Sequence, residues 1–192
     1  MSILGLSGGG GGAYVRFMPS ANAWVLGKDE IQLKKVLFDF DTLKTGWGMM
    51  AEGQAPSWVW DESLGKRGAR PGDEYKRGFS IMCYFGPQKG WAEWSSTGTG
   101  PCMGFEALAG EAMPQHKDNA GKVVAASYEG SRPGKVGKGN TRVPLFSLIG
   151  WVDKPEGGEA PAAAASAPPA TGSTAVPPPA KKAAAPADAD FG

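Results

Sequence analysis

The chain has 192 residues, a net charge of +1 and 41% hydrophobic residues, which suits one ordinary domain with a core of its own. Its N-terminus has no long apolar run, so we expect neither a signal peptide nor a membrane span, and a cytoplasmic setting is the default. Two cysteines without metal or redox spacing and a single histidine offer no ligand set for zinc, and we expect no cofactor and no metal.

Residues 1–12 are rich in glycine and are expected to be a flexible lead. Ala13-Tyr14-Val15 follows them, whereas a phosphate-binding loop needs a Gly-Lys-Ser/Thr sequence that opens a helix. The glycine-rich segment 137–141 fails the same test, so we expect no nucleoside-triphosphate site.

Residues 34–50 predict the first long strand. Every second residue from Val36 to Phe40 is apolar and lies on the same side of the strand. The pattern resumes through Gly46-Trp47-Gly48, where the glycines allow a bend or a bulge. The next segment, 51–73, contains several glycines and prolines and is expected to be a long irregular loop.

The clearest strand is 75–85, because Phe79, Ile81, Cys83 and Phe85 share one face. Its other face, with Lys76, Met82 and Tyr84, is expected to be open. A turn at 87–90 leads to a hairpin partner at 91–95. Only 101–113 has its apolar residues at helical spacing. Two further strands are predicted at 122–128 and 143–152, with a basic, glycine-rich loop at 129–142 between them.

Three strands, a helix and two strands, with long loops after the first and fourth strands, follow the order of an OB-fold. We therefore expect a mostly β protein, a five-stranded OB-fold barrel over residues 13–154 with one helix between strands three and four. The face of strands two and three and the two long loops form the binding surface of this fold. Another small β-barrel or a β-sandwich is the alternative.

Residues 155–192 differ in composition from the body. They lack Trp, Tyr, Leu, Ile and Met and consist mainly of Ala and Pro, which predicts a disordered tail. The net charge is +3 up to Lys154 and −2 after it. The tail ends in an acidic and aromatic tip, Asp188, Asp190 and Phe191, which a basic and apolar pocket on a partner protein could hold. The tip could also fold back over the basic surface of the body and compete with a ligand.

Basic and aromatic residues are interleaved in the first long loop and the strand after it. Positive charge follows a phosphate backbone, and flat rings stack on bases at roughly 1–3 kcal/mol per base with little sequence preference. Trp58 and Trp60 alternate around Val59, so both could instead face the core from one short strand. The candidate nucleic-acid-binding residues of this region are Trp47, Trp58, Trp60, Lys66, Arg67, Arg70, Tyr75, Lys76 and Arg77.

The loop at 129–142 carries a second basic cluster, Arg132, Lys135, Lys138 and Arg142. A pliable cationic loop could close over a strand and release counterions, while a solvated loop is the alternative. Tyr84 and Trp94 are further binding candidates on the second and third strands. Trp91 and Trp94 lie on opposite faces, so we expect one of the two in the core.

Asp39 and Asp41 share one face of the first strand, and convergent carboxylates hold the metals of two-metal nucleases. No third acid or lysine joins them at a recognisable spacing, which favours a solvated strand edge. His116 has no obvious nucleophile partner. We therefore predict no catalytic residue.

The chain resembles single-stranded DNA-binding proteins, more closely the bacteriophage-encoded ones with one OB-fold and a disordered acidic tail. The resemblance spans most of residues 40–155 and is carried by Gly46-Trp47-Gly48, Trp58-Val59-Trp60-Asp61, Tyr75-Lys76-Arg77-Gly78-Phe79, Glu93-Trp94-Ser95-Ser96 and residues 146–152. It implies that aromatic and basic residues of the barrel face bind single strands and that the tail tip binds replication and repair enzymes. This tip has fewer acids than is usual in the family and adds Gly192 after the ring.

We therefore expect a sequence-independent single-stranded DNA-binding protein, not an enzyme, that acts in DNA replication, recombination or repair (in the host cytoplasm if phage-encoded). Its tail would recruit replication or recombination proteins. Duplex DNA and RNA stay open as further ligands, and so does assembly into a homo-oligomer. The alternatives are an OB-like module that binds a protein or an oligosaccharide, and a small metal-dependent nuclease that uses Asp39 and Asp41.

Overall fold

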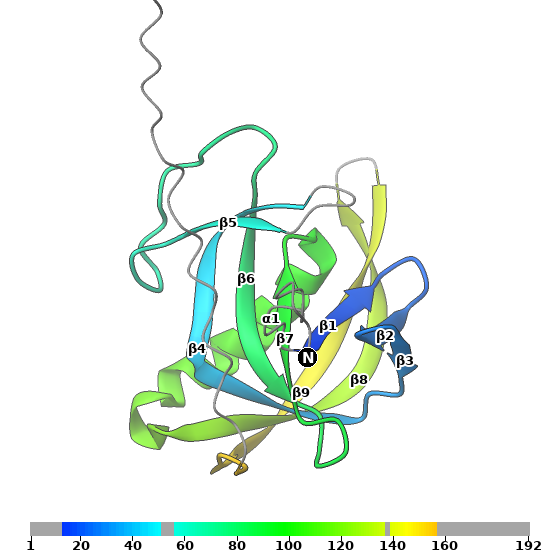
Figure 1. Cartoon of the computed structure of the whole chain (residues 1–192), viewed down its shortest axis with the longest axis vertical. Coiled ribbons are helices and arrows are strands. Elements are labelled where there is room, and N and C mark those ends of the chain that lie inside the picture. The colour runs from blue at the N-terminus through cyan, green and yellow to red at the C-terminus, as the bar shows by residue number, and fades with distance from the viewer. Residues whose placement is uncertain (1–12, 51–55, 137–138, 157–192) are drawn as a thin grey trace, which may run out of the picture.

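The computed structural model describes residues 13–50, 56–136 and 139–156, so the expected flexible lead and almost all of the expected tail with its tip lie outside the described residues. Within these ranges the chain forms one α-helix, two short 3-10 helices and nine strands in one sheet (Figure 1). No helix of these ranges is both long and apolar enough to cross a membrane. The elements are β1 (Ala13–Met18), β2 (Ala23–Leu26), β3 (Asp29–Ile31), β4 (Lys35–Met49), β5 (Ser57–Trp60), β6 (Lys76–Tyr84), β7 (Trp91–Ser96), α1 (Thr99–Ala112), η1 (Met113–Gln115), η2 (Lys117–Asn119), β8 (Lys122–Val136) and β9 (Gly139–Asp153).

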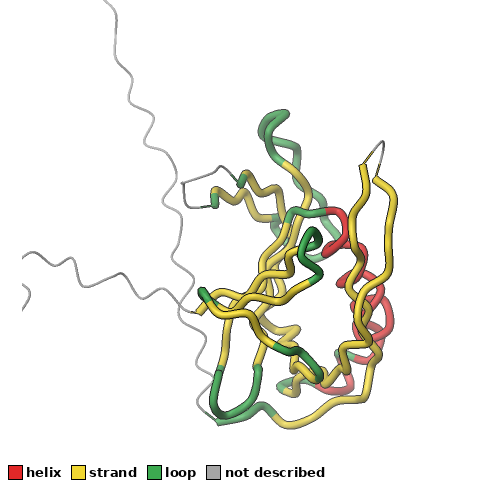
Figure 2. Tube along the Cα trace, turned by 90° about the vertical axis from the view of Figure 1, so that its right-hand side faces the viewer, coloured by secondary structure: helices red, strands yellow, loops and turns green. Residues whose placement is uncertain are grey.

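The strands follow the order β3-β2-β1-β7-β6-β4-β8-β9, and β5 pairs with β4 beside this path. Neighbouring strands are antiparallel except β1 and β7, which pair in parallel. The sheet curls into a half-barrel, and α1 lies along the β8–β9 hairpin (Figure 2). Two glycines allow this close approach, because a β-carbon at Gly100 or Gly104 would lie 2.2 Å from the carbonyl oxygen of Arg142 or 2.3 Å from that of Pro144.

The expected fold class is confirmed in its coarse features, a mostly β chain with one α-helix. The expected strands correspond to β4, β6, β7, β8 and β9, and α1 follows the third of them. The expected number of five strands is wrong. Strands β1 to β3 precede this series, and β5 lies within the segment expected to be an irregular loop.

The side chains of β6 point alternately to its two faces, as the sequence predicts, and one face packs into the core. Phe79, Ile81 and Cys83 are buried on the inner face. The ring of Phe79 stacks on Phe105 of α1 with centroids 4.2 Å apart and meets the edge of Trp94 at 4.8 Å. Burial of each large apolar side chain contributes about 1.5–3 kcal/mol, so these contacts fix the sheet against the helix.

The middle of β6 is buried on its other face too, which corrects the expectation that this whole face is open. Ser80 and Met82 are each only 7% exposed. The Ser80 hydroxyl donates a hydrogen bond to Glu93 Oε1 at 2.5 Å. Only the two ends of β6 are therefore accessible to a ligand on this face.

Strand β4 continues through both predicted parts, with a register shift between Asp39 and Lys44. The Thr42 hydroxyl donates to the Asp39 carbonyl oxygen at 2.7 Å and accepts the Met82 amide at 2.9 Å. These bonds satisfy backbone groups that the irregular register leaves without ladder partners.

The basic segment expected as a loop at 129–142 is part of a β-hairpin instead. Ser131 to Val136 of β8 pair with Gly139 to Pro144 of β9. Glycine and proline predicted a loop here, but Gly134 supports close packing, because a β-carbon there would lie 3.0 Å from Val143 Cγ2. The second basic cluster is thus mounted largely on paired strands.

Candidate nucleic-acid interface

One end of the half-barrel gathers the basic and aromatic segments. Strand β5, the loop 61–75, the paired residues 131–136 and 139–144 of β8 and β9 and the first turn of α1 all lie at the upper end of Figure 1, and Figure 2 places the loop and these paired residues at that same end. Most residues predicted to bind nucleic acid therefore come together, although they are distant in sequence.

Strand β5 places Trp58 and Trp60 on one face of the sheet, where they form what we call the tryptophan stack. Their ring centroids are 4.5 Å apart with an interplanar angle of 7°. Both side chains are half-buried. Lys44 Nζ lies 5.9 Å from the centroid of the Trp60 ring, within cation–π range. Since each ring covers one face of the other, an incoming base could stack only on an outer face.

Three glycines form the floor of the tryptophan stack. A β-carbon at Gly46 would lie 3.0 Å from Trp60 Cε3, and one at Gly48 would lie 2.7 Å from Trp58 Cζ3. At Gly78 it would lie 2.9 Å from Trp58 Cη2. The two rings can rest on β4 and β6 only because these positions lack side chains.

The opposite face of β4 and β6 carries a second aromatic and basic group around Trp47. The guanidinium carbons of three arginines lie over its ring, at 4.6 Å for Arg67 and 5.8 Å for Arg70 and Arg77. Trp47 Nε1 donates to the Gly68 carbonyl oxygen at 2.9 Å. We call these three side chains the arginine cluster. Trp47 is only 6% exposed, so it supports the arginines and offers little surface to a base.

Asp61 fixes the arginine cluster to the loop. Both Arg77 terminal nitrogens donate to its carboxylate, one of them to Oδ1 at 2.8 Å. It also accepts the Thr45 hydroxyl at 2.5 Å and the Gly68 amide at 3.0 Å. The hydrogen bonds from Arg77 hold the pKa of the Asp61 carboxyl far below its usual range. Its side chain is 2% exposed, so Asp61 holds the loop in place and is not available to bind a ligand.

Several predicted binding residues hold the loop together. Arg70 donates its Nε proton to the Tyr75 carbonyl oxygen at 2.9 Å and lies 3.7 Å from Asp73 Oδ1. The Tyr75 hydroxyl lies 3.3 Å from Ser57 Oγ. Lys66 forms an exposed ion pair with Glu62. Among the predicted cations of this region, Arg67 and Lys76 alone are exposed without an ion pair to a carboxylate of the described residues.

A groove of about 610 Å³ lies between the arginine cluster and α1. Trp47, Tyr75 and Phe79 line it from the strand side, and Cys102, Phe105 and Glu106 line it from the helix. Burial, with Glu106 as a second cause, raises the pKa of the Cys102 thiol to about 11. The cysteine is therefore a neutral part of the wall at ordinary pH.

Only part of the second basic cluster is available to contact a ligand. Arg132 and Lys135 are exposed on β8. Arg142 donates its Nε proton to Ser131 Oγ at 2.8 Å, which ties the two strands of the hairpin together. Lys138 lies outside the described residues.

Tyr84 and Trp94 do not join this end of the molecule. Trp94 is 1% exposed and packs in the core, with its ring 5.0 Å from Trp24, so it has no face on which a base could stack. Trp91, which lies on the opposite face of β7 from Trp94, is half-buried. Tyr84 lies 5.3 Å from Trp91 at the far end of β6. Eight residues separate it from Lys76, about 26 Å along the strand.

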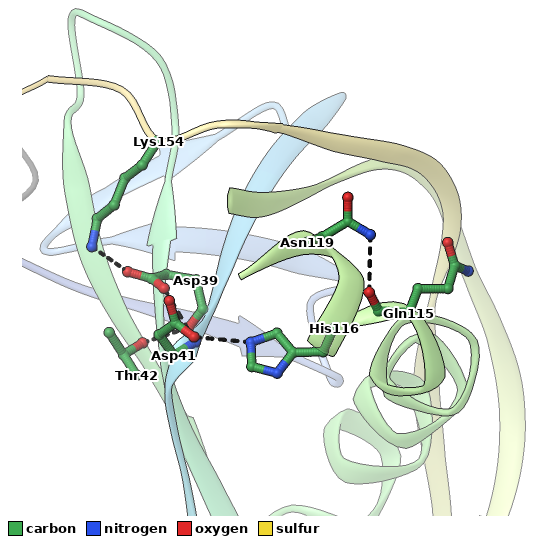
Figure 3. Close-up of polar contacts among 7 residues, drawn as sticks. All are labelled: Asp39, Asp41, Thr42, Gln115, His116, Asn119 and Lys154. Carbon is green, nitrogen blue, oxygen red and sulfur yellow. Dashed lines mark hydrogen bonds and ion pairs between the residues drawn. The ribbon is translucent and has the colours of Figure 1, made fainter. Parts of the chain in front are cut away.

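The two acids considered for a nuclease site are each paired with a base (Figure 3). Asp39 is buried and accepts a hydrogen bond from Lys154 Nζ at 2.6 Å. Asp41 Oδ1 lies 2.9 Å from His116 Nε2. The described part of the chain holds no group of three residues that could bind a metal ion. The expected solvated strand edge is wrong for Asp39, because its side chain is 2% exposed and forms a partly buried ion pair with Lys154.

Sequence reasoning missed Lys44 and Asp61. Lys44 could have been found from the period of two along β4, which places it on the face of Gly46 and Gly48. Asp61 carried no signal, since its partners Arg77 and Thr45 are 16 residues away in either direction. Comparisons of the chain with protein-family models, curated proteins and solved structures found no match.

Proposed function

We propose that the chain is a sequence-independent single-stranded DNA-binding protein that acts in DNA replication, recombination or repair. In this proposal β4, β6, β7, α1, β8 and β9 form an OB-like core, to which β1 to β3 and β5 are added. The order of three strands, a helix and two strands supports this assignment, as does the position of the basic segments. One lies between β4 and β6 and the other on the connected ends of β8 and β9, which are the two places where OB-folds carry their binding loops.

The observation that carries the proposal is the tryptophan stack beside Lys44. Two parallel rings on a glycine floor offer flat outer ring faces at the end of the half-barrel where the basic segments gather. Lys44 over Trp60 and the exposed Lys76 on the same face of the neighbouring strand supply positive charge next to it. Aromatic platforms bordered by cations bind single strands with little sequence preference, because every base has a π-face.

The charge distribution of this end supports a polyanionic ligand. Arg67, Arg132 and Lys135 are exposed there, in addition to the two lysines beside the tryptophan stack. Contacts of this kind release counterions from a phosphate backbone, so binding is expected to weaken steeply with salt. A platform for oligosaccharide rings would not need these charges.

The tail completes the proposed role. Asp188, Asp190 and Phe191 are proposed to recruit replication or recombination proteins, on the strength of their composition and of the family resemblance. The proposed activity is binding and not catalysis.

Fluorescence anisotropy with a labelled thymidine oligonucleotide tests the proposal. We expect binding that weakens between about 50 mM and 200 mM salt and that unlabelled single strands compete away better than duplex DNA. Single-stranded RNA as a competitor decides the preference between DNA and RNA. An oligonucleotide that does not bind at the lower salt concentration would overturn the proposal, and soluble oligosaccharides would then be the next ligands to test.

A further inference from the structure

The groove is a site separate from the tryptophan stack. Side chains alternate along β4 and β6, so Trp47 and Arg77 project to the face opposite the one on which Trp58 and Trp60 rest. Stacking of Phe79 on Phe105 identifies this face as the one that α1 covers. A strand bound on the tryptophan stack therefore leaves the groove available for a second ligand or for another part of the strand.

The shape and lining of the groove suit a small planar ligand. Its volume of about 610 Å³ lies within the range of small-molecule sites, roughly 300–1,000 Å³. Aromatic and apolar side chains make up much of the wall: Leu43, Trp47, Tyr75, Phe79, Phe105 and Ala109. Leu43, Tyr75 and Ala109 are the partly exposed members of this wall, and a flat heterocycle can bury one face against them.

The charges of the groove select an anion. The side chains of three arginines line it, Arg67, Arg70 and Arg77, against one acid, Glu106. Arg70 and Arg77 are held by the loop and by Asp61, whereas Arg67 has no ion pair within the described residues. Because Glu106 projects from the helix, the anionic group of a ligand is expected on the strand side, next to Arg67.

We propose that this groove binds a nucleoside monophosphate unit, with its base against the apolar wall and its phosphate against Arg67. The unit could be a free nucleotide or the terminal nucleotide of a bound strand, since both present the same base and phosphate. This inference rests on the proposed function for its biological meaning, but the site is distinct from the tryptophan stack and can be tested separately.

Cys102 provides a direct probe of the groove. It lines the wall and is half-buried, whereas Cys83, the other cysteine of the chain, is fully buried. A ligand in the groove should therefore shield one thiol from a maleimide reagent. The raised thiol pKa slows this reaction, so labelling is best followed at mildly alkaline pH.

The experiment measures the rate of Cys102 labelling in the full chain with thymidine monophosphate, thymidine or inorganic phosphate. We expect strong slowing by the monophosphate, weaker slowing by thymidine and least by phosphate. A 5′-phosphorylated thymidine oligonucleotide that protects Cys102 better than its unphosphorylated form would identify a strand end as the source. Protection by the monophosphate and by neither oligonucleotide would identify the free nucleotide.

Two variants provide a second readout by equilibrium dialysis of thymidine monophosphate. Ala109→Leu fills the groove and should weaken binding at least tenfold, while Ala107→Leu, on an exposed part of the same helix outside the groove, should leave it unchanged. Arg67→Ala should abolish the advantage of the monophosphate over thymidine, whereas Lys76→Ala, on the face of the tryptophan stack, should leave it unchanged.

No protection and no binding of the monophosphate, with oligonucleotide binding to the tryptophan stack intact, would overturn this inference and leave the proposed function standing. Binding of the monophosphate that Ala109→Leu does not weaken would overturn it as well. If instead the monophosphate binds and oligonucleotides do not, the proposed function fails and the groove site remains.

Discussion

Arg77 of β6 and Asp61, the residue after β5, form a bidentate ion pair although they are 16 positions apart in the sequence. The Asp61 side chain is almost fully buried, and its other bonds reach Thr45 of β4 and the Gly68 amide of the loop. One carboxylate thus connects three elements. The tryptophan stack precedes it on β5, and the arginine cluster lies around it, so both depend on this contact.

Replacement of Asp61 by Asn should destabilise the chain by about 2 kcal/mol at pH 7, because charge-assisted hydrogen bonds are lost. Because the pKa of Asp61 is lowered in the folded chain, the stabilisation is present above the unfolded pKa and is lost as the pH falls from about 5. Urea unfolding of both proteins between pH 7 and about pH 2 measures this effect. A stability difference that stays constant over that range would contradict it.

Replacement of Trp60 by Ala should weaken the binding of a thymidine oligonucleotide about 5- to 150-fold, since stacking contributes roughly 1–3 kcal/mol per base. Tyr84→Ala is the matched control, because Tyr84 is also a half-buried aromatic residue of the sheet but lies at the far end of β6. Anisotropy titrations compare the two. An equal loss in both variants would place the binding surface elsewhere.

Removal of a single exposed cation beside the tryptophan stack should reduce the salt dependence of oligonucleotide binding. Lys76→Ala is expected to lower the slope of log affinity against log salt by about one and to weaken all sequences alike. Lys89→Ala, exposed in the turn between β6 and β7 at the other end, should leave the slope unchanged. A Lys76→Ala protein with the slope of the original chain would show that Lys76 meets no phosphate.

Replacement by Ala should have opposite effects at Gly78 of the glycine floor and at Gly110 of α1. Gly78→Ala should destabilise the fold by about 1–3 kcal/mol, because its β-carbon would lie 2.3 Å from the Ser96 carbonyl oxygen and 2.9 Å from Trp58 Cη2. Gly110→Ala, in α1 with nothing within 4 Å, should stabilise it by about 1 kcal/mol. Thermal unfolding of both variants checks the pair. A neutral Gly78→Ala would mean that Trp58 does not rest on β6.

The elements with local patterns were predictable from the sequence. The alternation of 75–85, the turn after it and the apolar spacing of 101–113 located β6, β7 and α1. Strands β1 to β3 pair with one another as local antiparallel hairpins, but they were missed because β2 and β3 have only four and three residues. The pairing that joins them to the rest of the sheet, β1 in parallel with β7 almost 80 residues later, leaves no local signal. The two strands at 122–128 and 143–152 were predicted, but the segment 129–142 that extends them into one long hairpin was expected as a loop, because its glycines and prolines predict turns, whereas Gly134 packs against Val143.

The site was predictable in its composition but not in its arrangement. The chain's alternation around Val59 required Trp58 and Trp60 to share a face, and they do. The sequence pattern could not show that Lys44 lies on the same face as these two tryptophans. Nor could it show that the arginines gather around Trp47 on the opposite face. Nor could it choose between Trp91 and Trp94, since only the tertiary fold decides which side of β7 meets α1.

Quenching of intrinsic tryptophan fluorescence by a thymidine oligonucleotide tests the central claim most directly. The original chain is compared with a Trp58→Phe, Trp60→Phe variant, which keeps aromatic rings on the glycine floor but removes the reporters. We predict strong quenching that fades between about 50 mM and 200 mM salt and is largely lost in the variant. A flat titration at the lower salt concentration, or quenching that the variant retains in full, would contradict single-strand binding on the tryptophan stack.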